Sequence, residues 1–418
     1  MKYFKIQKLF GRFDYCITLS PDGLTILTGP NGYGKSTILR CIEAISIGNI
    51  KGIEFLCSLN FKNIFIGFED DSETIISKSE KKITINGISM PIEKFDFDTI
   101  NKKNFLHYYK VIRDLNMDES EIEFRDETPF SFNFGAPKNN EPIKKFKQEL
   151  FKLKEKVGQI YFIQEQRLIK RNDDTNKPIV NVIEQLPDNF KKLINSISSD
   201  YSSISNQLDS TYPMRLFNTE EGITIEEFEK KIFKMNGKFE KLNKYNLSSM
   251  KKLDNVIFKK EHAKALKIYF DDFEDKYEVY EDFIYRLDLF TNIIGDRLSF
   301  KKVIISKDNG ISIVNEEAPY LEIPLDKLSS GEKQEIVLFY ELIFETPKNQ
   351  LLLIDEPEIS LHISWQKKFM DDLLEIIKYK SLNVIVATHS PQIINNHWER
   401  QIDLGSLYGI QLDKAKSK

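Results

Sequence analysis

The sequence has few cysteines, no long apolar run and almost no net charge. Its three cysteines, Cys16, Cys41 and Cys57, form no CxxC pair and no zinc-binding pattern, so we expect reduced thiols. No segment reaches the roughly 18–20 apolar residues that span a bilayer, and the N-terminus lacks the apolar core of a signal peptide. A formal net charge of −4 gives no overall attraction to nucleic acid. We therefore expect a cytoplasmic protein with no membrane partner.

The chain has 418 residues, of which 41% are apolar and 30% are charged. This length and composition predict a globular protein of two or three structural units. The N-terminal part predicts strands within 1–28, a helix at 36–47 and short antiparallel strands within 53–93, with a hairpin turn at Asn86-Gly87. The middle predicts charged helix from about 100 to 156, a strand at 158–169 and mostly helix over 182–296. The C-terminal part predicts a hairpin at 301–315, followed by a helix at 331–345, a strand at 350–356, a helix at 364–378 and a strand at 383–390. The two ends of the chain therefore form one α/β fold with a split parallel sheet.

The segment GPNGYGKS, residues 29–36, matches G-x-x-x-x-G-K-[ST] between a predicted strand and a predicted helix. Glycines in such a loop let backbone N–H groups turn inward on a phosphate. The lysine reaches the β- and γ-phosphates, and the following hydroxyl binds Mg²⁺. We therefore predict a site for ATP and Mg²⁺, with these nucleotide-binding residues: Asn31, Gly32, Gly34, Lys35, Ser36 and Thr37.

The segment LLLIDEPEISLH, residues 351–362, places two acids at the end of an apolar strand. Ligands of α/β sheets bind at the carboxyl ends of the strands. We predict that Asp355 holds Mg²⁺ through a water molecule and that the Ser36 hydroxyl binds Mg²⁺ directly. Glu356 is the predicted general base for the attacking water.

Two further strand ends carry polar residues that suit the same site. His389, in VATHSPQII, follows an apolar strand. A lone histidine is more often structural, but beside a phosphate loop it can sense the γ-phosphate. Gln164 and Gln166 end another predicted strand, and one of them could touch Mg²⁺ or the lytic water. We favour Gln166, which Arg167 follows; a purely structural role is the alternative.

Two local patterns leave alternatives open. Arg12, Phe13 and Tyr15 are candidates for stacking on adenine and equally plausible strand residues. The segment DKLSSGEKQ, residues 326–334, is typical of a helix start, which Ser329 or Ser330 can cap. Its backbone N–H groups either begin a helix or bind a phosphate.

In order, GPNGYGKS, the strand-end glutamine, LSSGEKQ, LLLIDEPEISLH and THS resemble the motifs of ATP-binding-cassette (ABC) ATPases. The resemblance covers residues 1–95, 158–170 and 300–405. It implies that Ser329 and the Gly331 N–H contact the γ-phosphate of ATP bound to a second subunit, with 358–362 at the same interface. The implied domains are an N-terminal ABC-ATPase half (1–100), a helical connection with the glutamine strand (101–181), a helical insertion (182–296), a C-terminal ABC-ATPase half (297–405) and a tail (406–418).

Within that superfamily the chain resembles the RecF, SMC and OLD-like branch more than transporter subunits. The insertion is short and has no CxxC hook, and too few residues follow His389 for a TOPRIM nuclease domain. LSSGEKQEIVLFYELIF, ISLHISWQ and ATHSPQIINNHW are most similar to standalone ATPases of bacterial anti-phage systems, those of PARIS first and of Septu and retrons next. This implies a homodimer or higher homo-oligomer, a separate TOPRIM-like or HNH nuclease effector, and a nucleic-acid or phage-protein trigger.

Two other functions are compatible with the same motifs. A DNA repair or recombination ATPase could bind duplex DNA through the lysine-rich stretch 227–268. Those lysines alternate with acids, however, and such a run is usually a solvated face. A transporter subunit would require a membrane partner and usually lacks so large a helical insertion.

Overall fold

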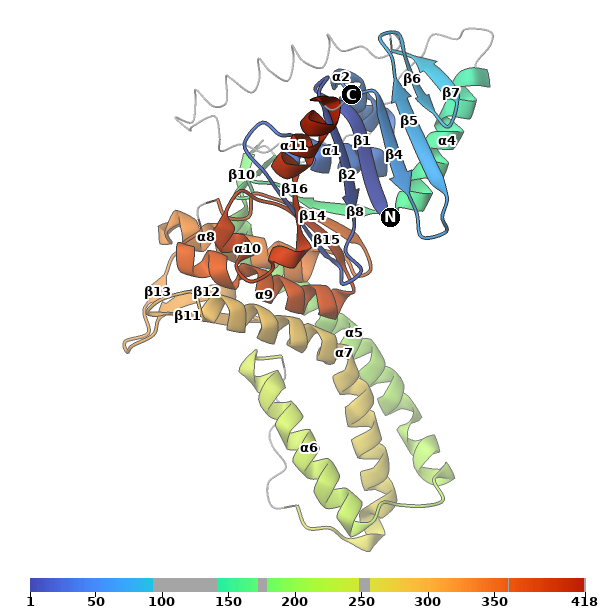
Figure 1. Cartoon of the computed structure of the whole chain (residues 1–418). Coiled ribbons are helices and arrows are strands. Elements are labelled where there is room, and N and C mark those ends of the chain that lie inside the picture. Colours follow the sequence, from blue (N-terminus) through green and yellow to red (C-terminus); the bar gives the residue numbers. More distant parts are fainter. Residues whose placement is uncertain (93–140, 172–178, 248–255, 360, 417–418) are drawn as a thin grey trace. The chain divides into compact units, whose positions relative to one another are not determined.

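The computed structural model describes residues 1–92, 141–171, 179–247, 256–359 and 361–416 (Figure 1). These residues form two compact units, one from Met1–Val180 with Phe344–Lys418 and the other from Asn181–Ile343. The first unit thus joins the two ends of the chain, as the split sheet predicts. The helix expected between residues 101 and 140 lies outside the described residues.

A five-stranded parallel sheet forms the centre of the first unit. Neighbouring strands follow the order β16 (Gln401–Asp403), β3 (Leu24–Thr28), β15 (Asn383–Ala387), β14 (Leu351–Asp355) and β8 (Ile160–Ile163), and every pair is parallel. Both β3 and β14 are buried along their whole length, as expected for inner strands covered on both faces. The predicted α/β class is confirmed. All five carboxyl ends face one edge of the sheet.

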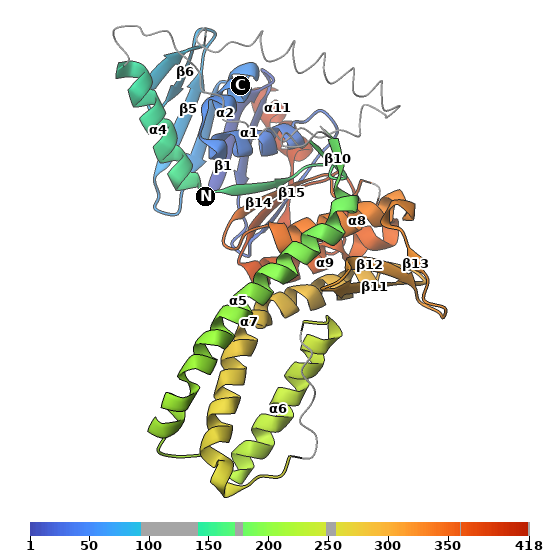
Figure 2. The ribbon, with the colours of Figure 1, turned by 180° about the vertical axis from the view of Figure 1, so that it is seen from behind.

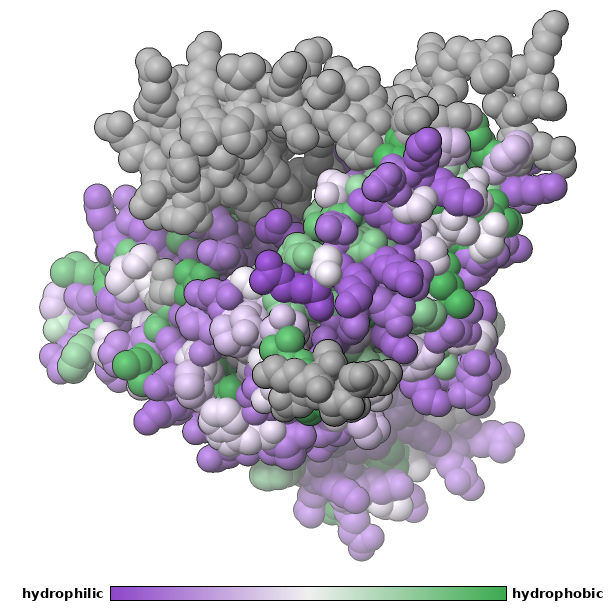
Figure 3. Space-filling model, turned by 45° about the horizontal axis from the view of Figure 1, so that its top comes forward, coloured by the Kyte–Doolittle hydropathy of each residue, from purple (hydrophilic) through white to green (hydrophobic). Residues whose placement is uncertain are grey.

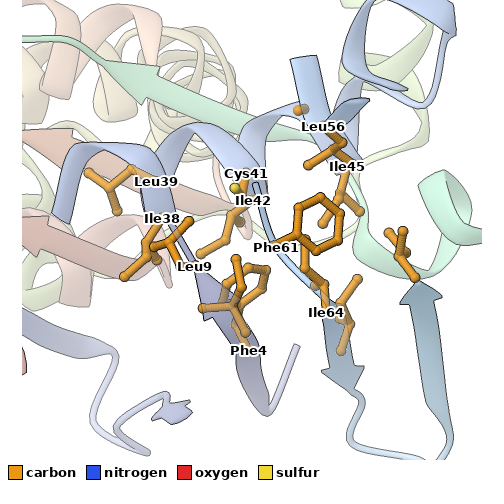
Figure 4. Close-up of a cluster of buried hydrophobic side chains, with 14 of the residues drawn as sticks. Phe4, Leu9, Ile38, Leu39, Cys41, Ile42, Ile45, Leu56, Phe61 and Ile64 are labelled. Atoms are coloured by element: carbon orange, nitrogen blue, oxygen red, sulfur yellow. The ribbon is translucent and has the colours of Figure 1, made fainter. Parts of the chain in front are cut away.

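A second, antiparallel sheet completes this unit. Its strands, in spatial order, are β2 (Phe13–Thr18), β1 (Tyr3–Leu9), β4 (Asn63–Gly67), β5 (Glu73–Lys78), β6 (Lys82–Ile85) and β7 (Ile88–Pro91). Asn86 and Gly87 join β6 to β7 with φ of 47° and 84°, the two positive values that a tight hairpin turn needs. Figure 4 shows apolar side chains of α1 (Lys35–Ile47), such as Ile38 and Ile42, packed with those of β1 and β4.

Three segments differ from the prediction. Residues 50–58, partly expected as strand, form helix α2, which starts where the Asn49 side chain accepts the Gly52 N–H. Its aromatic and β-branched residues mimic a strand pattern. Residues 406–416 of the expected tail belong to α11 (Leu404–Lys416), and β16 precedes it. This unit also contains α4 (Glu141–Val157), β9 (Ile169–Arg171), α9 (Ile363–Lys380) and α10 (Pro391–Ile394), and β9 pairs with β10 (Ile179–Asn181).

The second unit is built on three helices, α5 (Val182–Asn218), α6 (Ile225–Lys244) and α7 (Ala263–Gly295). Figures 1 and 2 show α6 alongside α7 from both sides. The residues predicted to be mostly helix over 182–296 are therefore helical over most of their described part. A capping box of Thr224 and Glu227 starts α6, and Lys231 and Lys244 of α6 bond to Asp271 and Asp288 of α7 at 2.6 Å each.

The same unit contains the strands that follow the insertion. β11 (Lys301–Ser306), β12 (Gly310–Asn315) and β13 (Glu322–Ile323) form a three-stranded sheet. This sheet and α8 (Ser330–Tyr340) pack against α5 and α7. The unit boundary therefore falls near Ile343, inside the domain expected over 297–405, because these elements share a core with the insertion helices.

The face seen in Figure 3 is mostly hydrophilic, with apolar side chains scattered over it. Among the helices that the structure describes, none has a stretch long and apolar enough to span a membrane. The three cysteines are free thiols, with Cys41 and Cys57 buried and Cys16 exposed.

Candidate nucleotide-binding and catalytic site

The phosphate loop connects the end of β3 to the start of α1. Gly29, Gly32 and Gly34 have φ of 139°, 81° and 90°, values that favour glycine. A Cβ on Gly34 would also lie 2.8 Å from Leu9 Cδ2. The N-cap residue of α1 is Gly34, which has no side chain that could cap the helix. Its first backbone N–H groups are therefore available to an anion, and the helix dipole favours a negative charge there.

Lys35 and Ser36 connect this loop to the predicted acids. The Lys35 side chain is buried; its Nζ donates to the Gly29 carbonyl at 3.0 Å and lies 3.7 Å from Glu356 Oε1. The Ser36 hydroxyl donates to Asp355 Oδ1 at 3.0 Å. A hydroxyl beside a carboxylate is an oxygen donor set that suits Mg²⁺. These residues fit a bound Mg·ATP, in which Lys35 would hold phosphate oxygens and Ser36 and Asp355 would hold the metal.

The register of two parallel strands brings the acids to the histidine. β14 and β15 pair with Asp355 opposite Ala387, and the Glu356 N–H donates to the Ala387 carbonyl at 2.9 Å. This pairing places His389 Nδ1 2.6 Å from Glu356 Oε2. The His389 side chain is 54% exposed and the Glu356 side chain only 12%. Histidine and glutamate, 33 residues apart in the chain, therefore form one polar group at the edge of the sheet.

Both acids have a raised pKa in this environment. Burial raises the pKa of Asp355 to about 6, although the Ser36 hydrogen bond opposes the shift. Burial, followed by the neighbouring Glu358 carboxylate, raises the pKa of Glu356 to about 7. A carboxylate with a pKa near neutrality accepts a proton more readily than an exposed one. This environment suits Glu356 to activate water.

The register of β8 changes the choice between the two glutamines. Ile163 of β8 lies opposite Ile354 of β14, so the next residue, Gln164, is level with Asp355. The Gln166 Oε1 instead accepts the Leu168 N–H at 3.1 Å, folding back on its own loop. Gln164 is therefore better placed than Gln166 to reach a metal bound at Asp355.

The remaining sequence candidates differ in their surroundings. Phe13 and Tyr15 are buried, with their rings stacked 5.6 Å apart, so they belong to the core and do not offer a face to adenine. Arg12 is exposed. In the phosphate loop, Asn31 is exposed, and Thr37 is half-buried in the first turn of α1.

The segment that resembles a signature loop caps α8 in the second unit. Ser329 Oγ accepts the Glu332 N–H at 3.3 Å, and the Glu332 carboxylate accepts the Ser329 N–H at 2.9 Å. The side chain of Lys301 bonds to Glu332. Ser329 and Ser330 are exposed, and Gly331 is half-buried. The helix-cap role is therefore confirmed, and contact with a second subunit's ATP stays a prediction.

Sequence reasoning missed one buried acid in this region. Glu358 accepts hydrogen bonds from Thr388 Oγ1 at 2.5 Å, the His389 N–H at 2.9 Å and the Ser390 N–H at 3.0 Å. The resemblance had placed it with residues 358–362 at a dimer interface. The last glutamate of DEPE and the hydroxyl of THS were the available signals, but only the register of β14 and β15 shows that they meet.

Comparison with known proteins addresses the chain as a whole. The sequence profile described as AAA ATPase domain matches residues 8–394. The chain belongs to this ATPase family. Binding and hydrolysing ATP is thus the activity expected from most of its length, in agreement with the geometry of Lys35, Asp355 and Glu356.

Individual relatives of this ATPase match shorter parts. An iron chelatin transport ATP-binding protein of Helicobacter pylori is 34% identical over 73 residues, covering 18% of this chain and 28% of the relative. Phosphonates import ATP-binding protein PhnC 2 of Rhodopseudomonas palustris is 30% identical over 132 residues, covering 29% and 48%. The chain thus spans at most about half the length of these curated relatives. The coarser prediction of an ABC-type ATPase is supported.

Solved structures of SMC heads are also similar. The Smc head domain with an extended coiled coil from Pyrococcus furiosus, bound to the C-terminal domain of ScpA, is 14% identical, with a TM-score of 0.39 and coverage of 96% of this chain and 92% of that one. The SMC head domain from Thermotoga maritima is 13% identical, with a TM-score of 0.33 and coverage of 94% and 90%.

Proposed function

We propose that this ATPase cleaves the γ-phosphate of ATP at the edge of the parallel sheet. The observation that carries the proposal is the contact of Lys35 and His389 with the two oxygens of one carboxylate, that of Glu356. Lys35 binds the phosphates, and Ser36 with Asp355 holds Mg²⁺. Glu356 takes the proton of the attacking water, and His389 donates a hydrogen bond to the transferred group.

Phosphate release from ATP by the purified chain tests this proposal. Lys35→Ala should abolish both hydrolysis and ATP binding, because it removes the cation directed at the phosphates. Lys81→Ala, a change of an exposed lysine between β5 and β6, is the control and should hydrolyse ATP normally. Equal activity of Lys35→Ala and the wild type would refute the assignment of the phosphate site.

We further propose that ATP joins two copies of the chain, with Ser329 and Gly331 of one copy on the γ-phosphate of the other. The support is the family resemblance together with the exposed start of α8. A helix start leaves its first N–H groups without intrahelical acceptors, and Ser329 and Ser330 are exposed there. The loop is therefore accessible to an anion carried by a second subunit.

Charge substitutions in this loop test the pairing. Ser329→Arg and Gly331→Asp should leave ATP binding intact and abolish ATP-dependent dimers, measured by light scattering after gel filtration. Asp near a helix start favours the helix, so Gly331→Asp does not weaken α8. Ser203→Arg, at an exposed position on α5, is the control. Normal ATP-dependent dimerisation of both loop variants would show that the loop is only a cap.

The biological role that we propose is bacterial anti-phage defence, as the sensor and scaffold for a separate nuclease effector. The resemblance of the motifs to PARIS, Septu and retron ATPases supports this role, and the helical insertion supplies a surface for the effector. In other switch proteins a bound nucleoside triphosphate orders an interface, and hydrolysis releases it. Co-purification with the product of the adjacent gene, lost in Lys35→Ala, is the expected result. Phage protection by this chain alone would count against it.

The alternative of a DNA-binding repair ATPase has less support. Lysines of α6 within the stretch 227–268 pair with acids of α7, Lys231 with Asp271 and Lys244 with Asp288, while Lys238 bonds to Glu274. Lysines paired in this way offer less positive potential to a DNA backbone. Salt-dependent stimulation of hydrolysis by duplex DNA would restore this alternative.

A further inference from the structure

Glu358 is a carboxylate in an unusual place for an acid. It is 7% exposed and lies in the turn between β14 and α9. One of its oxygens, Oε1, accepts three hydrogen bonds, from the Thr388 hydroxyl and from the N–H groups of His389 and Ser390. Glu358, which follows β14, thus binds the backbone that follows β15.

This burial is costly unless the charge is compensated. Within the described ranges of the chain, no lysine or arginine forms an ion pair with Glu358; the nearest basic atom is His389 Nδ1, 3.4 Å from Oε1. Among the described residues, none forms a hydrogen bond with the other, buried oxygen, Oε2. A buried carboxylate satisfied on one side only is unfavourable for stability alone. Its contacts instead converge on the loop that carries the phosphate sensor.

The same carboxylate also lies beside the general base. One ligand atom each of Glu356, Glu358 and His389 falls within 4.8 Å of the other two. His389 Nδ1 is 2.6 Å from Glu356 Oε2. The backbone N–H that Glu358 binds belongs to the residue whose ring contacts Glu356. A shift of this loop would therefore displace the ring from the base.

We propose that Glu358 is a positioning residue for ATP hydrolysis, holding the 388–390 backbone so that the His389 ring meets Glu356 and the γ-phosphate. The inference rests on the proposed ATPase function. Three hydrogen bonds to one oxygen define the loop position, in the way that outer contacts orient the groups that perform chemistry. Glu358 itself does not touch the nucleotide in this mechanism; it acts through His389.

The test is the steady-state kinetics of Glu358→Ala and Glu358→Gln. Glu358→Ala should lower kcat about 100-fold, the cost of misplacing a catalytic group by about 1 Å, with KM for ATP unchanged. Glu358→Gln keeps an oxygen that accepts the same N–H groups and should recover most of this loss. A Glu358→Gln as slow as Glu358→Ala, or a wild-type kcat in Glu358→Ala, would overturn the proposal.

A double variant shows whether the effect passes through the histidine. In a His389→Ala background, Glu358→Ala should have no further effect on kcat, because the group it positions is gone. Multiplicative losses would overturn the proposal. Glu375→Ala, an exposed glutamate on α9, is the control for the fold and should match the wild type.

A milder change covers the case in which Glu358→Ala does not fold. Thr388→Val removes one donor to Glu358 and should lower kcat about tenfold, the kinetic equivalent of one hydrogen bond; unchanged kcat would overturn the proposal. Failure of the inference is distinguishable from failure of the function. An inactive wild type refutes the ATPase assignment, whereas an active wild type with equally active Glu358 variants refutes only the role of Glu358.

Discussion

Replacing Glu356, the proposed general base, should separate ATP binding from hydrolysis. In Glu356→Gln the amide keeps the size of the side chain and can still bond to His389, but it cannot take a proton from water. Loss of a general base lowers kcat about 10²- to 10⁴-fold, or about 3–5 kcal/mol of transition-state stabilisation. The 12% exposure of the side chain limits replacement of the base by bulk water, so the upper half of this range is expected.

The same substitution should not weaken ATP binding. Glu356 Oε1 lies 3.7 Å from Lys35 Nζ, a Coulomb attraction of about 4 kcal/mol at an effective dielectric constant of about 20. This attraction competes with the phosphates for Lys35, so neutralising Glu356 frees the lysine for ATP.

Two measurements check both expectations, namely single-turnover phosphate release and equilibrium binding of a fluorescent ATP analogue. Glu375→Gln on α9 is the control for a neutralised but exposed glutamate. Turnover of Glu356→Gln within a few-fold of the wild type would refute the base assignment. Loss of nucleotide binding would refute the competition for Lys35.

Three further predictions concern the glycine loop, the core of the second unit and the metal. Gly34→Ala combines a φ of 90° with a Cβ 2.8 Å from Leu9 Cδ2, so it should abolish ATP binding in a binding assay. Gly87→Ala, with a φ of 84° and open space around it, is the control and should only lower the free energy of unfolding, by about 1–3 kcal/mol. Arg297→Met should lower the free energy of unfolding in urea by about 3–5 kcal/mol, because it leaves its buried partner Glu335 charged; adding Glu335→Leu should restore most of the loss, and no recovery would contradict the pairing. Asp355→Asn should raise the Mg²⁺ concentration needed for half-maximal hydrolysis about 10- to 100-fold, and an unchanged magnesium titration would exclude Asp355 from the metal site.

The sequence predicts those parts of the site that lie on local motifs. The phosphate loop, the acid pair and His389 each follow or precede a strand with a strong apolar pattern, so their place at one sheet edge could be expected. The choice between Gln164 and Gln166 could not, because it depends on the register of β8 against β14. A shift of one or two residues changes which side chain is level with Asp355, and no local pattern records that register.

Other errors have the same physical origin. Residues 50–58 read as partly strand, because aromatic and β-branched residues favour strands locally. They form helix α2 instead, and Gly52 lies so close to the Ala44 carbonyl that a Cβ would not fit there. Strand β16 has three residues and no pattern of its own; it forms because it pairs with β3. For Phe13 the sequence leaves an adenine contact and a strand position both open, and in the structure Phe13 packs against Tyr15, Tyr33 and Tyr408. Each of these outcomes depends on tertiary contacts.

The backbone at Glu356 shows how such contacts support the proposed chemistry. Its φ of 43° lies in the left-handed region, which is unfavourable for a residue other than glycine by about 1–3 kcal/mol. Pro357, which follows, restricts its backbone further. The conformation is held because the Glu356 N–H donates to the Ala387 carbonyl of β15, and because Glu358 accepts hydrogen bonds from the three residues that follow β15, 388–390. The Glu356 and His389 backbones are therefore fixed to one another by hydrogen bonds on both sides of the strained residue. A nucleotide-driven change that moves β15 against β14 would displace Glu356 and His389 together. The rate of hydrolysis is therefore expected to depend on the relative position of these two strand ends.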